Sequence, residues 1–303
     1  MTLIKSIEKQ DCASLFPNRP DRMNKGDAGR VLVVCGSYDR EELSMCGAAY
    51  FAAKAAYLCG AGVVEIFTAK ENYSALASLV PEAVFSLYGY EEETKAVADR
   101  LKKSIVKSDA VVIGCGLGKS DTAKSLVEAA FESVTCPMVI DADGLNILSE
   151  NGELWRLLDG EQGKRTVVTP HPGEMSRLTG KFVRDILECV PEACSDFALK
   201  KGIVCLLKDH NTAIGDGKTV YINQSGNPGM ATAGAGDVLA GIIGALLART
   251  ECDSDILKAV AISAYLHGLA GDLAACRVGE YSLTAGALLS EIPMAIRDIF
   301  SEK

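Results

Sequence analysis

The sequence predicts an α/β protein with a central, mostly parallel sheet, helices on both faces of that sheet and a helical C-terminal third. Short β-branched apolar runs alternate with longer helical segments, which is the pattern of repeated β-α units. Most of the runs lack alternating polar residues, and this favours strands buried on both faces, as parallel strands are. Beyond residue 223 the strand pattern ends and long apolar helical segments follow.

The expected strands are short runs rich in Val, Ile and Leu that end close to Gly, Asp, Thr or Lys. They cover residues 30–35, 63–68, 83–88, 110–114, 138–141, 166–169 and 203–208. A hairpin is expected at 211–223, because Gly215, Asp216 and Gly217 form a typical turn between two apolar runs.

The expected helices lie between these strands or after them. They cover residues 46–58, 92–104, 121–134, 192–201, 237–249, 254–276 and 282–299. The first of them has Lys54 as its only charged residue and is otherwise dominated by small residues, so we expect it to be enclosed nearly all round by close neighbours. Its N-terminus follows the first strand of the repeat, where open parallel sheets bind ligands.

The composition is that of a soluble globular protein. Of its 303 residues 48% are hydrophobic and 23% are charged, which excludes a disordered chain. No linker or repeat divides the sequence, so we expect one domain at 26–303 preceded by an N-terminal arm at 1–25. The formal net charge of -9 argues against a nucleic-acid partner, because binding many phosphates requires a surplus of Lys and Arg.

The sequence also favours a cytoplasmic protein with no membrane partner. The apolar run 238–247 is shorter than the roughly 18 residues of a membrane-spanning helix, and residues 1–25 carry charges throughout. The 11 cysteines include no pair with C-x-x-C spacing, so neither a disulfide framework nor a zinc site is indicated.

Two glycine-rich segments compete as the phosphate site. The first, 113–120, follows an expected strand and ends in Gly118, Lys119 and Ser120, as a Walker A loop does. The Walker A spacing requires a glycine five residues before Gly118, and Ile113 occupies that position. The segment is therefore a strand-end loop whose backbone can approach a ligand, or one whose glycines only turn the chain.

The second segment, 226–237, leads directly into an apolar helix. The N–H groups of Gly234, Ala235 and Gly236 can face one point at the positive end of the helix dipole, which makes an anion hole. Asp237 beside it can accept a proton from a hydroxyl that is being phosphorylated, or it can be an ordinary helix cap. The catalytic interpretation requires a cavity that reaches residues 234–237 from His171.

Several motifs in a fixed order carry a family resemblance. They are R-V-L-V-V-C-G-S with G-A-A at 30–49, G-L-G at 116–118, D-A-D-G-L-N at 141–146, T-P-H-P-G-E at 169–174 and G-A-G-D-V-L-A-G at 234–241. From Asn24 to Ile296 the chain resembles the ADP/ATP-dependent NAD(P)H-hydrate dehydratases of the ribokinase-like superfamily. G-A-G-D alone is shared with many sugar and vitamin kinases, whereas T-P-H-P-G-E and D-A-D-G-L-N in this order are more specific.

The resemblance implies a metabolite-repair reaction. A hydrated nicotinamide cofactor, NADHX or NADPHX, is phosphorylated on its C6 hydroxyl by ADP or ATP with Mg²⁺, and loss of phosphate then regenerates NADH or NADPH. It also implies a homo-oligomer, expected to be a tetramer. The epimerase domain that some relatives carry is expected to be absent, so a separate NAD(P)H-hydrate epimerase would act on the same substrate.

The resemblance also implies site residues. Hydrate-binding positions fall on Ala48, Gly118, His171 and Asp237. Nucleotide contacts fall on Lys208, Asp209, His210, Asn211, Thr212 and Gly236. Glu174 matches an acid that holds Mg²⁺ through water, and a helix-cap or surface role is the alternative. From the residues alone, His210 and His267 are structural or solvated.

Several questions stay open in the sequence. Asp141 and Asp143 either orient substrate and metal-bound water or hold the turn after their strand. The insertion at 38–45 and Asn24, where relatives often have His, depart from the family pattern. The sequence does not decide between ADP and ATP or between NADHX and NADPHX. A small-molecule kinase for a hydroxymethylpyrimidine, a thiazole or a sugar, or a nucleotide sensor without turnover, are the alternatives.

Overall fold

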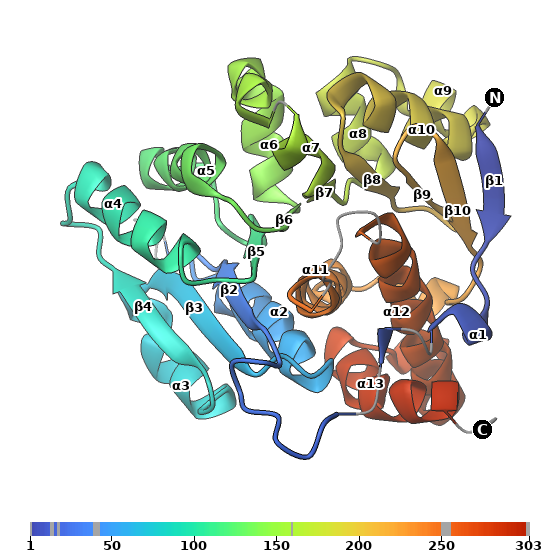
Figure 1. Cartoon of the computed structure of the whole chain (residues 1–303), viewed down its shortest axis with the longest axis horizontal. Helices are drawn as coiled ribbons and strands as arrows, with labels where there is room; N and C mark the ends of the chain where they lie inside the picture. Colours follow the sequence, from blue (N-terminus) through green and yellow to red (C-terminus); the bar gives the residue numbers. More distant parts are fainter. Residues whose placement is uncertain are drawn as a thin grey trace.

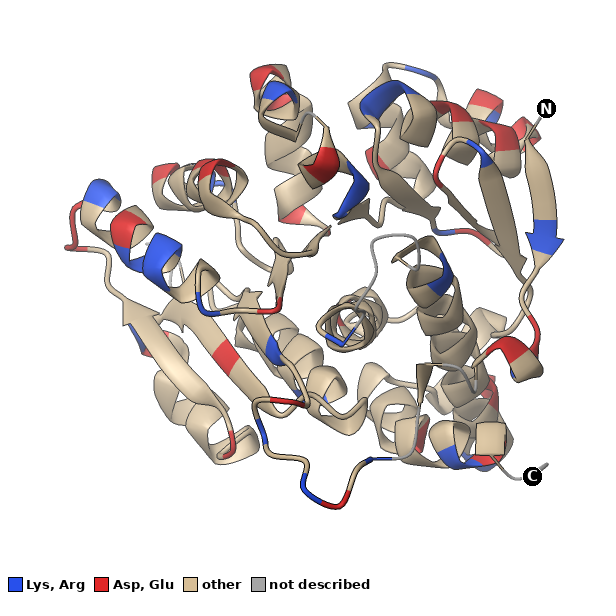
Figure 2. Ribbon diagram, viewed as in Figure 1, with Lys and Arg blue, Asp and Glu red and all other residues tan. Residues whose placement is uncertain are grey.

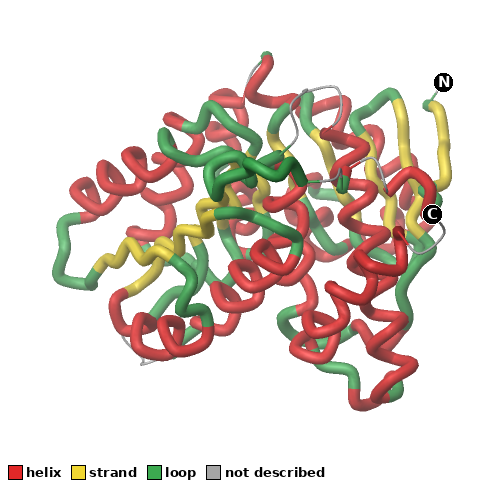
Figure 3. The backbone as a smooth tube through the Cα atoms, turned by 60° about the horizontal axis from the view of Figure 1, so that its bottom comes forward, coloured by secondary structure: helices red, strands yellow, loops and turns green. Residues whose placement is uncertain are grey.

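The computed structural model describes residues 2–12, 15–16, 19–38, 43–158, 160–249 and 256–300. Over these residues the chain forms one ten-stranded sheet with helices on both sides (Figure 1). The strand order is β1-β10-β9-β8-β7-β6-β5-β2-β3-β4, and among these strands β9 alone runs antiparallel to its neighbours. The strands form a continuous band between the helices (Figure 3). The expected α/β fold class is confirmed.

The expected strands are all present, with ends that differ by one or two residues. The segment expected to be an arm contributes a further edge strand, which no apolar pattern marks because all of its residues are exposed. The strands are β1 Leu3–Ser6, β2 Arg30–Val34, β3 Val63–Ala69, β4 Val84–Tyr88, β5 Ala110–Ile113, β6 Met138–Ile140, β7 Thr166–Val168, β8 Val204–Leu207, β9 Thr212–Gly215 and β10 Thr219–Asn223.

The helices include several short ones that the sequence did not predict, because fewer than three turns show no full amphipathic period. The expected helix 237–249 begins two residues earlier, and the expected start at 254 lies outside the described residues. The α-helices are α1 Lys9–Cys12, α2 Cys46–Leu58, α3 Tyr73–Leu79, α4 Thr94–Ile105, α5 Asp121–Ser133, α6 Asp143–Glu150, α7 Glu161–Lys164, α8 Pro172–Thr179, α9 Val183–Glu188, α10 Val190–Lys201, α11 Ala235–Leu247, α12 Ile256–Val278 and α13 Ala285–Phe300.

Two hydrophobic cores lie on opposite faces of the sheet, and β2 contributes to both. Val31 and Val33 pack into the core shared with α2, α11, α12 and α13, whereas Leu32 and Val34 pack into the core shared with α4 and α5. Successive side chains of a strand point to opposite faces, so an unbroken apolar run is what a strand buried on both faces needs. Charged residues of both signs are spread over the outer helices and the loops (Figure 2).

The Ala-rich helix α2 packs closely against α11, as its small residues predict. A Cβ atom added to Gly241 of α11 would lie 2.1 Å from the Ala52 carbonyl oxygen of α2. Ala49, Ala52 and Ala53 are fully buried. This contact fixes α11, and with it the glycine-rich segment at its start, against the sheet.

Helix α12 is, within the described chain, the one helix that is long and apolar enough to cross a membrane by length and composition. The sequence interpretation did not count it, because Lys258, His267 and Asp272 interrupt its apolar runs. Most of its apolar window is buried in the protein, and it packs against α11 and α13. Those are the properties of a core helix.

The strand order reverses at β2, which has β3 on one side and β5 on the other. The loops that follow β2 and β5 therefore leave the sheet from adjacent strands toward opposite sides, and this is where open parallel sheets form a ligand crevice. The two loops start in contact, because the Gly36 amide donates to Cys115 O at 2.9 Å and the Ser37 amide to Gly116 O at 2.7 Å. Residues 39–42 of the insertion lie outside the described residues.

Candidate functional site

A cavity of about 690 Å³ opens at the carboxyl ends of the strands. It extends from His171 to Ala235 and Gly236, whereas Gly234 and Asp237 are not part of its lining. Of the expected nucleotide contacts, Asn211 alone is not part of its lining. The lining consists of His171, Lys208, Asp209, His210, Thr212, Asn223, Ser225, Gly226, Asn227, Pro228, Met230, Ala231, Thr232, Ala235, Gly236, Leu239, Ala264, His267 and Gly268.

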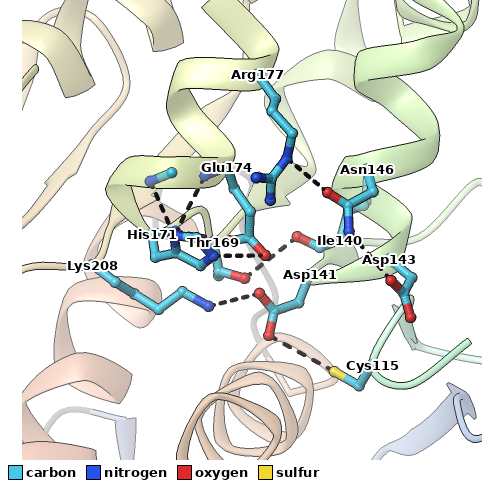
Figure 4. A network of polar contacts seen from close by, with 11 residues as sticks. Cys115, Ile140, Asp141, Asp143, Asn146, Thr169, His171, Glu174, Arg177 and Lys208 are labelled. Carbon is cyan, nitrogen blue, oxygen red and sulfur yellow. Dashed lines mark hydrogen bonds and ion pairs between the residues drawn. The ribbon is translucent and has the colours of Figure 1, made fainter. Parts of the chain in front are cut away.

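Lys208 and Asp141 form an ion pair at the edge of this cavity (Figure 4). Lys208 follows β8 and Asp141 follows β6, and the Lys208 Nζ lies 2.7 Å from the Asp141 Oδ1. Burial acts to lower the pKa of Lys208, but the carboxylates of Asp141 and Glu174 outweigh it and raise that pKa. The lysine is therefore a fixed cation.

Asp237 lies against Asp141 and Cys115, with one ligand-type atom of each within 4.8 Å of the others. Burial, and then the charge of Asp141, raise the pKa of Asp237 to about 6, although the Cys115 thiol and Lys208 act in the opposite direction. The pKa of Cys115 is itself raised by its hydrogen bond with Cys35 and by burial, so its thiol stays protonated. A carboxyl group with a pKa near neutrality is suited to accept a proton in a reaction.

The start of α11 offers free backbone donors. Gly234 is the N-cap with φ +90°, so Asp237 lies in the first turn and is not the cap. The Ala235 amide donates to Thr232 O at 3.3 Å, whereas the amides of Gly236 and Asp237 have no backbone acceptor in the described part of the chain. Two adjacent N–H groups at a helix N-terminus are the usual arrangement for binding an anion.

His171 is the N-cap residue of α8. Its Nδ1 accepts hydrogen bonds from the amides of Gly173 at 3.0 Å and Glu174 at 3.4 Å, and Glu174 Oε2 accepts from the His171 amide at 2.9 Å. Because Nδ1 is an acceptor, the neutral ring carries its proton on Nε2. Burial, followed by Lys208 and Arg177, lowers the pKa of His171. His171 lines the cavity, and its Nε2 lies 3.5 Å from the Glu174 Oε1.

Glu174 has both structural and electrostatic roles in this arrangement. Its side chain completes the capping box of α8, so the helix-cap reading of the sequence holds for one of its oxygens. The carboxyl group is buried, and this burial raises its pKa. Lys208 acts to lower the pKa of Glu174, and Asp141 acts to raise it. Figure 4 shows it between His171 and the Asp141 ion pair.

Ala48 and Gly118 both lie outside the lining of the large cavity. Ala48 is in the first turn of α2, and a Cβ atom on Gly116 would lie 2.9 Å from the Ala48 Cβ. The Gly118 amide donates to the Asp143 Oδ2 at 2.9 Å. Asp143 thus holds the loop after β5, while Asp141, two residues before it, pairs with Lys208.

Asp272 and His267 on α12 were not predicted as site residues. Asp272 accepts hydrogen bonds from the Gly226 amide and the Asn227 Nδ2, both at 2.9 Å, and so holds the loop after β10 that lines the cavity. His267 Nε2 lies 2.9 Å from Ala235 O. The only available sequence signal was a polar residue inside an apolar helix.

The family profile described as NAD(P)H-hydrate dehydratase matches residues 31–294. The chain belongs to this family. The resemblance seen in the sequence motifs is confirmed.

Relatives agree with the profile match. The chain is 39% identical over 300 residues to the bifunctional NAD(P)H-hydrate repair enzyme Nnr of Moorella thermoacetica, covering 96% of this chain and 53% of that protein. It is 38% identical over 285 residues to the ADP-dependent (S)-NAD(P)H-hydrate dehydratase of Neisseria meningitidis, covering 93% and 88%. The chain spans about half the length of the bifunctional relatives it matches.

Solved structures share the fold over nearly the whole chain. A ribokinase-like superfamily protein from Enterococcus faecalis superposes with a TM-score of 0.82 at 26% identity, covering 98% of this chain and 96% of the other. A protein from Streptococcus mutans superposes with a TM-score of 0.81 at 27% identity, covering 97% and 99%. The expected ribokinase-like architecture is confirmed.

Proposed function

We propose that this protein is an ADP- or ATP-dependent NAD(P)H-hydrate dehydratase that returns NADHX or NADPHX to NADH or NADPH. The observation that carries the proposal is the position of Asp237, whose pKa is raised to about 6, next to the free amides that begin α11 and beside a nucleotide-sized cavity. Membership of the dehydratase family supports the same activity.

The first step is phosphorylation of the hydrate. The C6 hydroxyl oxygen bonds to the terminal phosphorus of the nucleotide while the bond to the bridging oxygen breaks, releasing AMP or ADP. Asp237 takes the hydroxyl proton as the new bond forms. The amides of Gly236 and Asp237 and the helix dipole stabilise charge on the phosphoryl oxygens during the transfer.

The second step is elimination. Phosphate is a far better leaving group than hydroxide, and the lone pair of the ring nitrogen expels it as the bond from C6 to oxygen breaks. Loss of a proton from the neighbouring ring carbon then restores the double bond. Ala48, Gly118 and His171 would bind the hydrate, and the His171 Nε2–H can donate to its carboxamide or diphosphate oxygens.

The nucleotide would lie along the wall formed by the segment after β8. Lys208 supplies a fixed cation beside Gly236, and a Cβ atom on Gly236 would lie 3.5 Å from the Lys208 Nζ. The other proposed contacts follow it directly in the chain. They are Asp209, His210, Asn211 and Thr212.

Mg²⁺ fits the donor set of this site. Asp141 and the buried Glu174 offer carboxylate oxygens, the atoms that this ion prefers, whereas the Cys115 thiol stays protonated. Glu174 would hold the ion through water. When bound, Mg²⁺ neutralises charge on the nucleotide phosphates.

We also propose the cellular setting of the reaction. The catalytic unit would be the single domain 26–303, acting in the cytoplasm as a homo-oligomer, with a tetramer as the expected form. An NAD(P)H-hydrate epimerase would interconvert the two hydrate epimers for it. Sedimentation of the purified protein tests the assembly.

The experiment that tests the function mixes the protein with Mg²⁺, NADPHX and either ADP or ATP and follows the absorbance of reduced nicotinamide. We expect the absorbance to rise with at least one donor, and comparing the donors identifies the preferred one. Nucleotide consumption with a vitamin precursor but not with NADPHX would mean a small-molecule kinase. Binding without product in either assay would mean a sensor.

A further inference from the structure

We propose that His267 recognises the phosphoryl donor by accepting a hydrogen bond from a ribose hydroxyl. The proposal rests on the proposed function, because it takes the large cavity to be the nucleotide site. It assigns to a half-buried histidine of α12 a role in selecting the ligand, where the sequence indicated only a structural or solvated residue.

The hydrogen-bond partner of His267 fixes which ring nitrogen carries the proton. Nε2 lies 2.9 Å from the carbonyl oxygen of Ala235, which can only accept, so Nε2 is the donor. Burial lowers the pKa of His267 to about 4, even though the Ala235 hydrogen bond acts to raise it. The ring is therefore neutral near pH 7, and its Nδ1 is a lone-pair acceptor.

This Nδ1 opens on the cavity. Within the described residues Nδ1 has no hydrogen-bond partner. It is also not one of the fully buried polar atoms without a partner, so it is accessible to solvent. His267 lines the cavity together with Leu239, Ala264 and Gly268. The acceptor must therefore be satisfied by whatever fills that space.

The polarity of Nδ1 decides which part of a nucleotide can lie there. Phosphate oxygens of ADP and ATP only accept hydrogen bonds near neutral pH, so they cannot pair with a second acceptor. The donors of an adenine nucleotide are its ribose hydroxyls and the amino group of the base. His171 has the opposite arrangement, because its Nδ1 accepts from backbone amides and its Nε2, 3.5 Å from the Glu174 Oε1, carries the proton.

The position of His267 favours the ribose over the base. The carbonyl that holds the ring belongs to Ala235, the residue directly before Gly236, whose free amide is the proposed phosphate contact. The ribose is the part of a nucleotide attached to the phosphates, whereas the base lies farther away. His267 on α12 thus contacts α11 at the residue directly before the proposed phosphate site.

Calorimetric titration of the wild-type protein with ADP, 2′-deoxy-ADP, 3′-deoxy-ADP and IDP tests the proposal. We expect one of the two deoxy nucleotides to bind roughly five- to tenfold more weakly than ADP, the usual value of a single neutral hydrogen bond, and IDP to bind within about twofold of ADP. This series needs no variant, so it is independent of any folding defect.

The variants then assign the effect to His267. In His267→Phe, we expect ADP to bind as weakly as the sensitive deoxy nucleotide. In His267→Gln, which keeps a donor and an acceptor, we expect part of the preference to return. A preference that persists in His267→Phe, deoxy nucleotides that match ADP in the wild type, or a loss with IDP alone would each overturn the proposal. Failure of ADP and ATP to bind at all would instead overturn the proposed function.

Discussion

The Lys208 Nζ lies 2.7 Å from the Asp141 Oδ1, although the two residues are 67 positions apart and follow strands separated by β7. Both charges act on Asp237 from this position: Asp141 raises the pKa of Asp237 and Lys208 lowers it. The ion pair therefore adjusts the proton affinity of the proposed base. The ends of β6 and β8 and the first turn of α11 thus meet at one proton-transfer group.

Replacement of the proposed base tests its chemical role most directly. We expect Asp237→Asn to reduce turnover by about 10²- to 10⁴-fold, because the geometry is kept while the proton acceptor is lost. Affinity for ADP should change little. Single-turnover kinetics and calorimetry measure the two effects, and Asp99→Asn on the exposed face of α4 is the matched control. Activity equal to that of the wild type would leave Asp237 with only a structural role at the start of α11.

The pH dependence of activity should report the same group. The ionised form of Asp237 is the base, so kcat/KM of the wild type should fall as pH drops through about 6. Lys208→Met removes a cation that lowers the pKa of Asp237, so the acidic limb should move to higher pH. Lys208→Arg keeps the charge and should leave the limb in place. If the pH profile is identical in the wild type and both variants, ionisation of Asp237 does not control kcat/KM.

The raised pKa of Asp237 should also make the free energy of unfolding depend on pH. The pKa of Asp237 in the folded protein, about 6, is above its ordinary value of 3.8, so the folded state holds this proton more tightly than the unfolded state does. Ionisation of Asp237 therefore destabilises the fold as pH rises from about 4 to 6. We expect Asp237→Asn to be more stable than the wild type at pH 7, with the gain vanishing near pH 4. Urea denaturation across this range measures it, and a gain that is constant with pH would contradict the shift.

The sequence predicted those parts of the site that depend on local pattern. The apolar strands, the Ala-rich helix 46–58 and the glycines before Asp237 each have a local physical cause, namely burial on both faces, close backbone approach and free amides at a helix start. The contact between Lys208 and Asp141 has no local signal, because it depends on the strand order. The same is true of β1, whose exposed residues join the sheet only through β10.

Replacement of Asp272, a residue that the sequence did not mark as functional, tests the role of the loop after β10. It holds Gly226 and Asn227 against α12, so Asp272→Ala should loosen the cavity wall after β10. We expect a several-fold increase in the KM for the nucleotide with kcat within about twofold, since the lost hydrogen bonds position a binding loop and touch no reacting atom. Glu291→Gln, which weakens the contact of Glu291 with Arg277 in the last turn of α12, is the control for general loosening of that helix. A change in kcat alone would place Asp272 in the chemistry.

The packing of α2 against α11 sets the position of the whole glycine-rich segment. In Gly241→Ala the new Cβ would meet the Ala52 backbone oxygen at 2.1 Å, so the helices must separate, and we expect a loss of roughly 1–3 kcal/mol in the free energy of unfolding. Gly286→Ala in the first turn of α13 is the matched control, because the new Cβ would come no closer to the other described residues than 3.8 Å, at the Thr284 Oγ1. That variant should be neutral or more stable by up to about 1 kcal/mol, since alanine favours a helix over glycine. Equal stability of the two variants in urea would mean that α2 and α11 are not in backbone contact, and the position of Asp237 would then need another support.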